Sequence, residues 1–316
     1  MLKRFAAGAA LIAKAIRAFV AFPQLIVPLL ATWLIYAPTL VYSRYFIEWD
    51  AYSVGVQLAI VFGLLLVLSF VISSACLVLL ELIEQIESGR AVDLGGAARS
   101  AVPNIGRAFP IMLLWAVLWF LITVVEMVLP RRDDNGNSNP SAQDVAETVA
   151  GFGRFSISHA LLEALSKGVR MLAFLIYPAI AWERMSARDA LKKGLGVAQA
   201  HKAEFAGGFV MTEVAATIVL LPPTAVFILS DDFNVAFPDA VWFVVIVYCA
   251  FAWSFSVMLE QMFAAQLYLW HTQWEDACAA ARANGWELPA LRDVKQPSLV
   301  DGISAMKPAA QSETPG

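Results

Sequence analysis

The chain has 316 residues, of which 59% are hydrophobic and 15% are charged. Its mean hydropathy is +0.67. A soluble globular protein has about half apolar and about a quarter charged residues. This composition therefore excludes a soluble enzyme, a nucleic-acid-binding module and a disordered protein, and it predicts an all-α polytopic membrane helix bundle.

The first 21 residues predict an amphipathic helix. At about 100° per residue, the apolar face collects Phe5, Ile12, Ile16 and Phe19, and the opposite face collects Lys3, Lys14 and Arg17. A basic amphipathic helix of this kind lies in the headgroup layer of a membrane. We expect it at the cytoplasmic surface, leading into the first membrane span.

Six segments are expected to cross the bilayer, because each offers about 20 mostly apolar residues. They are residues 22–43, 55–80, 109–130, 160–182, 206–230 and 240–262. Two of them are less clear than the others. The fourth begins with charged residues, and the fifth holds Glu213 and the pair Pro222-Pro223, which predicts a break or kink.

The basic residues predict the orientation. With six spans, 16 of the 22 Lys and Arg residues fall on the side of the two termini and 4 on the other. Cytoplasmic loops are enriched in Lys and Arg, so both termini are expected in the cytoplasm of a bacterial cell, with the protein in its inner membrane. A five-span alternative without residues 160–182 would place the basic residues of 183–205 outside.

A repeated unit is a further expectation. Phe19, Phe109 and Phe205 each end a basic segment that precedes an odd-numbered span. The chain can therefore be divided into three hairpins, each preceded by a cytoplasmic amphipathic helix, at 1–21, 94–108 and 187–204. The alternative is that any hairpin with a basic flank shows this pattern.

One stretch resembles a known family. It runs from Ala173 through Pro178 to Trp182-Glu183, and the basic segment from Ala187 to Gly194 follows it. This resembles a bacterial family of six-span membrane proteins of unknown function, which is similar to the membrane domain of some glycerophosphodiester phosphodiesterases. The resemblance covers about residues 1–270 and implies architecture and location. It brings no catalytic residues, and the soluble phosphodiesterase domain has no counterpart here.

Charged residues inside spans are candidates for function, because they are costly in a bilayer. The outer half is expected to hold a polar site made of Glu126, Glu163, Lys167 and Arg170. The last three share one helical face, and the four charges sum to zero. This set predicts either a solute path, a structural ion-pair network, or a helix whose first turns stand outside the membrane.

Two carboxylates, Glu213 and Glu260, are secondary candidates in the inner half. Neither has an evident cation in its own span. They could form a proton relay, extend to the inner interface, or pair with Lys202 or Arg184.

The sequence contains no recognisable enzyme motif, metal site or cofactor site. His159, His201 and His271 are expected in three separate places, without the spacing of metal ligands. Residues 1–270 form the predicted membrane domain. Residues 271–316 are expected to continue the last span as a cytoplasmic helix to about Ala281, with a break at Asn284-Gly285 and a disordered tail.

These features predict a non-catalytic integral inner-membrane protein with an accessory, scaffold or regulatory role. The alternative is a transporter or channel for a small solute or ion that uses the intramembrane charges. The expected partners are the lipid bilayer and other membrane proteins or a second copy of the chain, and not nucleic acid. A polar cavity would favour transport, whereas a well-packed core with an exposed apolar groove would favour a scaffold.

Overall fold

The computed structural model describes residues 2–128, 157–231, 233 and 235–295, and every regular element among them is helical. The eight α-helices are α1 (Leu2–Ala21), α2 (Val27–Tyr45), α3 (Val54–Glu87), α4 (Leu94–Val128), α6 (Ile157–Ala181), α7 (Ala187–Ala200), α8 (Lys202–Asp231) and α9 (Asp239–Asn284). Short 3₁₀ turns lie at Pro23–Ile26, Trp49–Ala51 and Leu291–Asp293. The all-α prediction is confirmed for this part of the chain.

Five helices, α2, α3, α4, α8 and α9, are long and apolar enough to cross a membrane. They overlap the spans predicted at 22–43, 55–80, 109–130, 206–230 and 240–262. The segment predicted at 160–182 also forms a helix, α6. Its side chains are described only from Lys167 onwards, so its crossing of the membrane stays a prediction.

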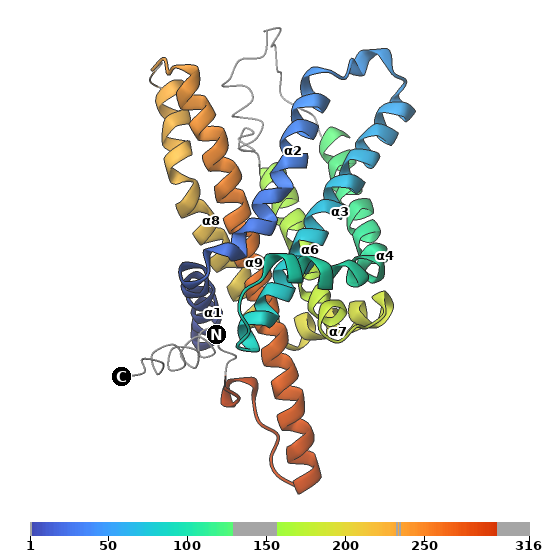
Figure 1. Cartoon of the computed structure of the whole chain (residues 1–316), viewed down its shortest axis with the longest axis vertical. Coiled ribbons are helices and arrows are strands. Elements are labelled where there is room, and N and C mark those ends of the chain that lie inside the picture. Colours follow the sequence, from blue (N-terminus) through green and yellow to red (C-terminus); the bar gives the residue numbers. More distant parts are fainter. Residues whose placement is uncertain (1, 129–156, 232, 234, 296–316) are drawn as a thin grey trace, which may run out of the picture.

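Three boundaries differ from the sequence-based expectation or refine it. The predicted helix 94–108 is not a separate element but the first part of α4, which continues through Pro103 and Pro110 and changes direction along its length (Figure 1). Helix α8 is likewise continuous through Pro222 and Pro223. Helix α9 runs on to Asn284 and ends as predicted, where Gly285 adopts a left-handed conformation with φ +67°.

Small side chains bring the helices together at one end of the bundle. A Cβ atom on Gly194 of α7 would lie 3.1 Å from the Ile176 backbone of α6, and one on Gly208 of α8 would overlap the Phe263 ring of α9. Glycine therefore permits both approaches. The core behind them is formed by fully buried side chains such as Leu77, Tyr177 and Phe263.

The two ends of the bundle differ. The α2–α3 and α8–α9 connections lie at one end, and α1, the first part of α4, and α7 lie towards the other, where α9 projects beyond the remaining helices (Figure 1). Near its connection, the α8–α9 hairpin has a separate small core of Phe227, Trp242, Val245 and Cys249. The extensive packing is therefore concentrated towards the end that carries α1 and α7.

Candidate functional site

Four charged side chains from three helices meet inside the bundle. Lys167 and Arg170 belong to α6, where a spacing of three residues places them on one face. Glu213 lies on α8 and Glu260 on α9. We call these four residues the ion cluster.

Arg170 and Glu260 form a doubly hydrogen-bonded pair. The Nε and Nη2 atoms of Arg170 donate to the two carboxylate oxygens of Glu260 over 2.8 and 2.9 Å. Only 1% of the Glu260 side chain is exposed. Two parallel, charge-assisted hydrogen bonds fix both distance and orientation, so this pair holds α6 against α9.

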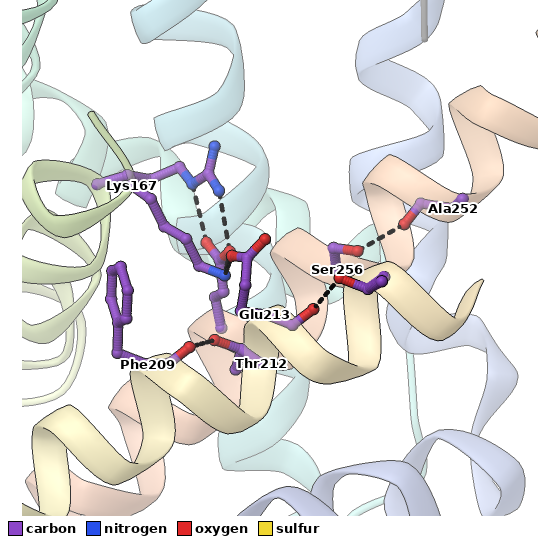
Figure 2. Close-up of polar contacts among 9 residues, drawn as sticks. Lys167, Phe209, Thr212, Glu213, Ala252 and Ser256 are labelled. Carbon is purple, nitrogen blue, oxygen red and sulfur yellow. Dashed lines mark hydrogen bonds and ion pairs between the residues drawn. The ribbon is translucent and has the colours of Figure 1, made fainter. Parts of the chain in front are cut away.

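Lys167 connects the remaining carboxylate. Its Nζ atom donates to Oε2 of Glu213, lies 3.6 Å from Oε1 of Glu260, and stands 5.2 Å from the centre of the Phe209 ring. Figure 2 shows Lys167 reaching across to Glu213, with Phe209 beside it. Lys167 is buried, whereas 53% of the Glu213 side chain is exposed. The cluster thus has a buried carboxylate, Glu260, and an exposed carboxylate, Glu213.

The cluster is electrically neutral, with two cations and two carboxylates. An unpaired charge at the centre of a bilayer costs about 2.5–3.5 kcal/mol on insertion scales. Mutual pairing lets α6, α8 and α9 carry charge within an apolar bundle. Chemically, the arrangement can hold three helices together, and the exposed carboxylate of Glu213 can accept a polar ligand.

The sequence-based division of the charges into an outer and an inner group is wrong. Glu213 and Glu260, which have no evident cation in their own spans, pair with Lys167 and Arg170 rather than with Lys202 or Arg184. The ends of the apolar segments predict a depth for each residue, but the relative axial position of two helices depends on how they pack. No local pattern in the sequence contains that offset.

The other two members of the predicted site cannot be placed. The side chains of Glu126 and Glu163 lie outside the described residues, although their backbones belong to α4 and α6. Their proposed contact with Lys167 and Arg170 stays a prediction.

Two further hydrogen bonds join neighbouring helices. Tyr36 donates to the carbonyl of Leu68 over 2.7 Å, and the hydroxyls of Ser73 and Tyr177 are 2.6 Å apart. These contacts join α2 to α3 and α3 to α6. Their residues look like ordinary core positions in the sequence, so sequence reasoning missed them.

A second polar group lies at the end of α6, in the stretch that carries the family resemblance. Lys193 of α7 donates to both oxygens of Glu183 over 2.6 and 2.8 Å, and Tyr268 of α9 donates to Glu183 over 2.5 Å. Lys193 also lies over the Tyr268 ring, 5.2 Å from its centre. Glu183 therefore ties the end of α6 to two further helices.

Two of the three histidines lie together, contrary to the prediction from the sequence. Nε2 of His201 and Nδ1 of His271 are 2.8 Å apart in a buried contact, and Nε2 of His271 lies 3.2 Å from Glu275. His201 and His271 were expected in separate places, but the start of α8 packs beside α9. His159 lies outside the described side chains.

No group of three or more His, Cys, Asp or Glu side chains suited to a metal ion occurs in the described part of the chain. The comparisons with known proteins give no further guide, since no family model, curated protein or solved structure matches this chain.

Proposed function

We propose that this is a non-catalytic integral protein of the bacterial cytoplasmic membrane, with an accessory, scaffold or regulatory role. One observation supports this most. The buried charges neutralise one another within a packed bundle, and Glu260, at 1% exposure, uses both oxygens on cations of α6. Such a cluster serves to hold helices in place.

The surface of the α8–α9 hairpin supports the same role. Large apolar side chains along it are exposed, among them Ile218, Leu221, Phe243 and Val244. Among the described helices, α8 packs mainly against α1 and α9. The remaining apolar surface is available to lipid tails and to the helices of other membrane proteins.

The proposed topology has six crossings, with α6 as the fourth and both termini in the cytoplasm. The asymmetry of 16 to 4 basic residues supports it. In a cysteine-free background, Tyr52→Cys should react with an impermeant thiol reagent on intact cells, whereas Gln199→Cys should react only after lysis. Labelling of Gln199→Cys alone on intact cells contradicts the topology.

Co-purification from membranes in mild detergent tests the scaffold role. We expect defined membrane proteins to accompany the wild-type chain and to be lost when Ile218 and Leu221 are both replaced by Ala. The matched control replaces Leu34 and Ile35 on the exposed face of α2. Equal loss from both variants, or no specific companion, contradicts the proposal.

Transport of a small solute or ion is the second candidate function. The observation in its favour is the exposed carboxylate of the ion cluster, since 53% of the Glu213 side chain is exposed on a membrane-length helix. Proteoliposomes containing a pH-sensitive dye distinguish transport from the scaffold role. A proton flux through the wild-type protein that Glu213→Gln abolishes would support transport. A flux no higher than background in both the wild type and Glu213→Gln would support the scaffold role.

A further inference from the structure

The three segments predicted to be amphipathic, 1–21, 94–108 and 187–204, share a way of packing. Each turns small residues towards the bundle. In α1 the fully buried pair is Ala15 and Ala18. The first part of α4 buries alanines at 97, 101 and 108 in the same way, and α7 buries Ala190 and Gly194. Because these side chains are small, the three segments lie close against the membrane-length helices.

The outward faces of the same segments combine basic and large apolar side chains. Arg17 and Val20 are exposed on α1, Arg99 and Val102 on α4, and Arg188, Lys192 and Leu195 on α7. The exposed fractions of Val20, Val102 and Leu195 are 75%, 62% and 37%. We call Arg17, Arg99, Arg188 and Lys192 the basic collar.

The helices that carry the collar hold little negative charge of their own. Neither α1 nor α4 up to Val125 contains an acidic residue. On α7, the Asp189 carboxylate accepts a hydrogen bond from the hydroxyl of Ser186, the N-cap residue, and the nearby Glu183 accepts hydrogen bonds from Lys193 and Tyr268. Among the described residues, none of the four collar side chains has an ion pair.

The position of the collar indicates its partner. Its three segments lie towards one end of the helices that can cross a membrane (Figure 1). They lie there because α1 leads into α2, α4 follows the end of α3, and α7 lies between the end of α6 and the start of α8. If those helices cross a bilayer, the collar is level with lipid headgroups.

We infer that the basic collar binds the anionic phospholipid headgroups of the leaflet in which it lies. A guanidinium group matches a phosphodiester in charge and geometry, while Val20, Val102 and Leu195 need a partner that is also apolar. An anionic phospholipid offers both parts, whereas a soluble anion does not cover the apolar side chains. The inference rests on the membrane placement proposed above.

The test measures the apparent melting temperature of the purified full chain in dodecyl maltoside micelles. Phosphatidylglycerol or phosphatidylcholine with the same acyl chains is added. We expect phosphatidylglycerol to raise the wild-type melting temperature more than phosphatidylcholine does. Arg188→Gln should reduce this difference, and the double variant Arg99→Gln/Arg188→Gln should reduce it further.

Two controls make the test specific. Arg282→Gln changes an exposed arginine at the projecting end of α9, and it should keep the full response to phosphatidylglycerol. Arg99→Lys/Arg188→Lys retains the charges and should keep most of it, which also guards against variants that simply fold poorly. Inorganic phosphate at the same concentration should have no such effect.

Three results would overturn the inference. These are an equal response to the two lipids in the wild-type chain, an unchanged response in the double glutamine variant, and an equal stabilisation by inorganic phosphate. If the cysteine labelling supports the topology while the response to phosphatidylglycerol is absent, lipid binding by the basic collar is rejected and the membrane placement stands.

Discussion

Arg170 and Glu260 are 90 residues apart in the chain, yet two guanidinium nitrogens lie 2.8 and 2.9 Å from the two carboxylate oxygens. The pair joins α6 to α9, the longest helix described. The charges on α6 are therefore compatible with a position inside the bundle, because their partners are provided by neighbouring helices.

Glu260→Gln should strongly destabilise the protein, because it leaves Arg170 and Lys167 short of one buried carboxylate. Breaking a buried pair costs about 3–5 kcal/mol, and unfolding in detergent would measure it. The control is Glu84→Gln, since the pair of Glu84 with Arg90 is exposed and such pairs contribute about 1 kcal/mol or less. Similar losses in the two variants would contradict a stabilising role for the ion cluster.

Glu213→Gln should cost less than Glu260→Gln, because half of the Glu213 side chain lies outside the packed helices, whereas Glu260 is buried and meets both Lys167 and Arg170. Lys167→Met should cost more than Glu213→Gln, since Lys167 is buried and serves both carboxylates. The double variant Lys167→Met/Glu213→Gln, measured by the same unfolding, should lose less than the two single losses combined. Strict additivity would show that the two residues are not coupled.

Gly208→Ala should destabilise the contact of α8 with α9. The new Cβ atom would lie 2.0–2.3 Å from three atoms of the Phe263 ring, and overpacking of this kind costs about 1–3 kcal/mol. Adding Phe263→Leu to Gly208→Ala should recover part of the melting temperature. The control, Gly196→Ala, meets no atom within 4 Å and should be neutral or stabilising by up to about 1 kcal/mol. The close approach would be disproved if both alanine variants melted alike.

His271 should make stability depend on pH. It lies on α9 beyond the proposed crossing 240–262, and burial lowers its pKa from the ordinary 6.5, although Glu275 opposes this. The unfolded chain therefore takes up a proton more readily than the folded chain, and acidification from about pH 7.5 to about pH 5.5 favours unfolding. The melting temperature should fall over this interval, and His271→Asn should reduce the fall.

Glu275→Gln provides the opposing test. Without the carboxylate that raises the pKa of His271, the folded chain should resist protonation more strongly, so the fall in melting temperature should become larger. Equal pH profiles for the wild type, His271→Asn and Glu275→Gln would exclude His271 as a source of the pH dependence.

The sequence alone determined the all-α class of the protein and the approximate positions of its apolar helices. Long apolar runs identified five of the membrane-length helices, the amphipathic period identified α1, and the Asn284-Gly285 pair located the end of α9. These features depend on hydrophobicity and backbone preference over neighbouring residues, so they can be recognised in one chain.

Only the tertiary structure decided which polar residues meet. Lys167 pairs with Glu213 and Arg170 with Glu260, and His201 touches His271, across separations of 46, 90 and 70 residues. Such contacts depend on the rotation of each helix about its axis and on the axial offset between helices. Packing against several neighbours at once sets both quantities, as the glycine at 208 under the Phe263 ring illustrates, and no local pattern encodes them.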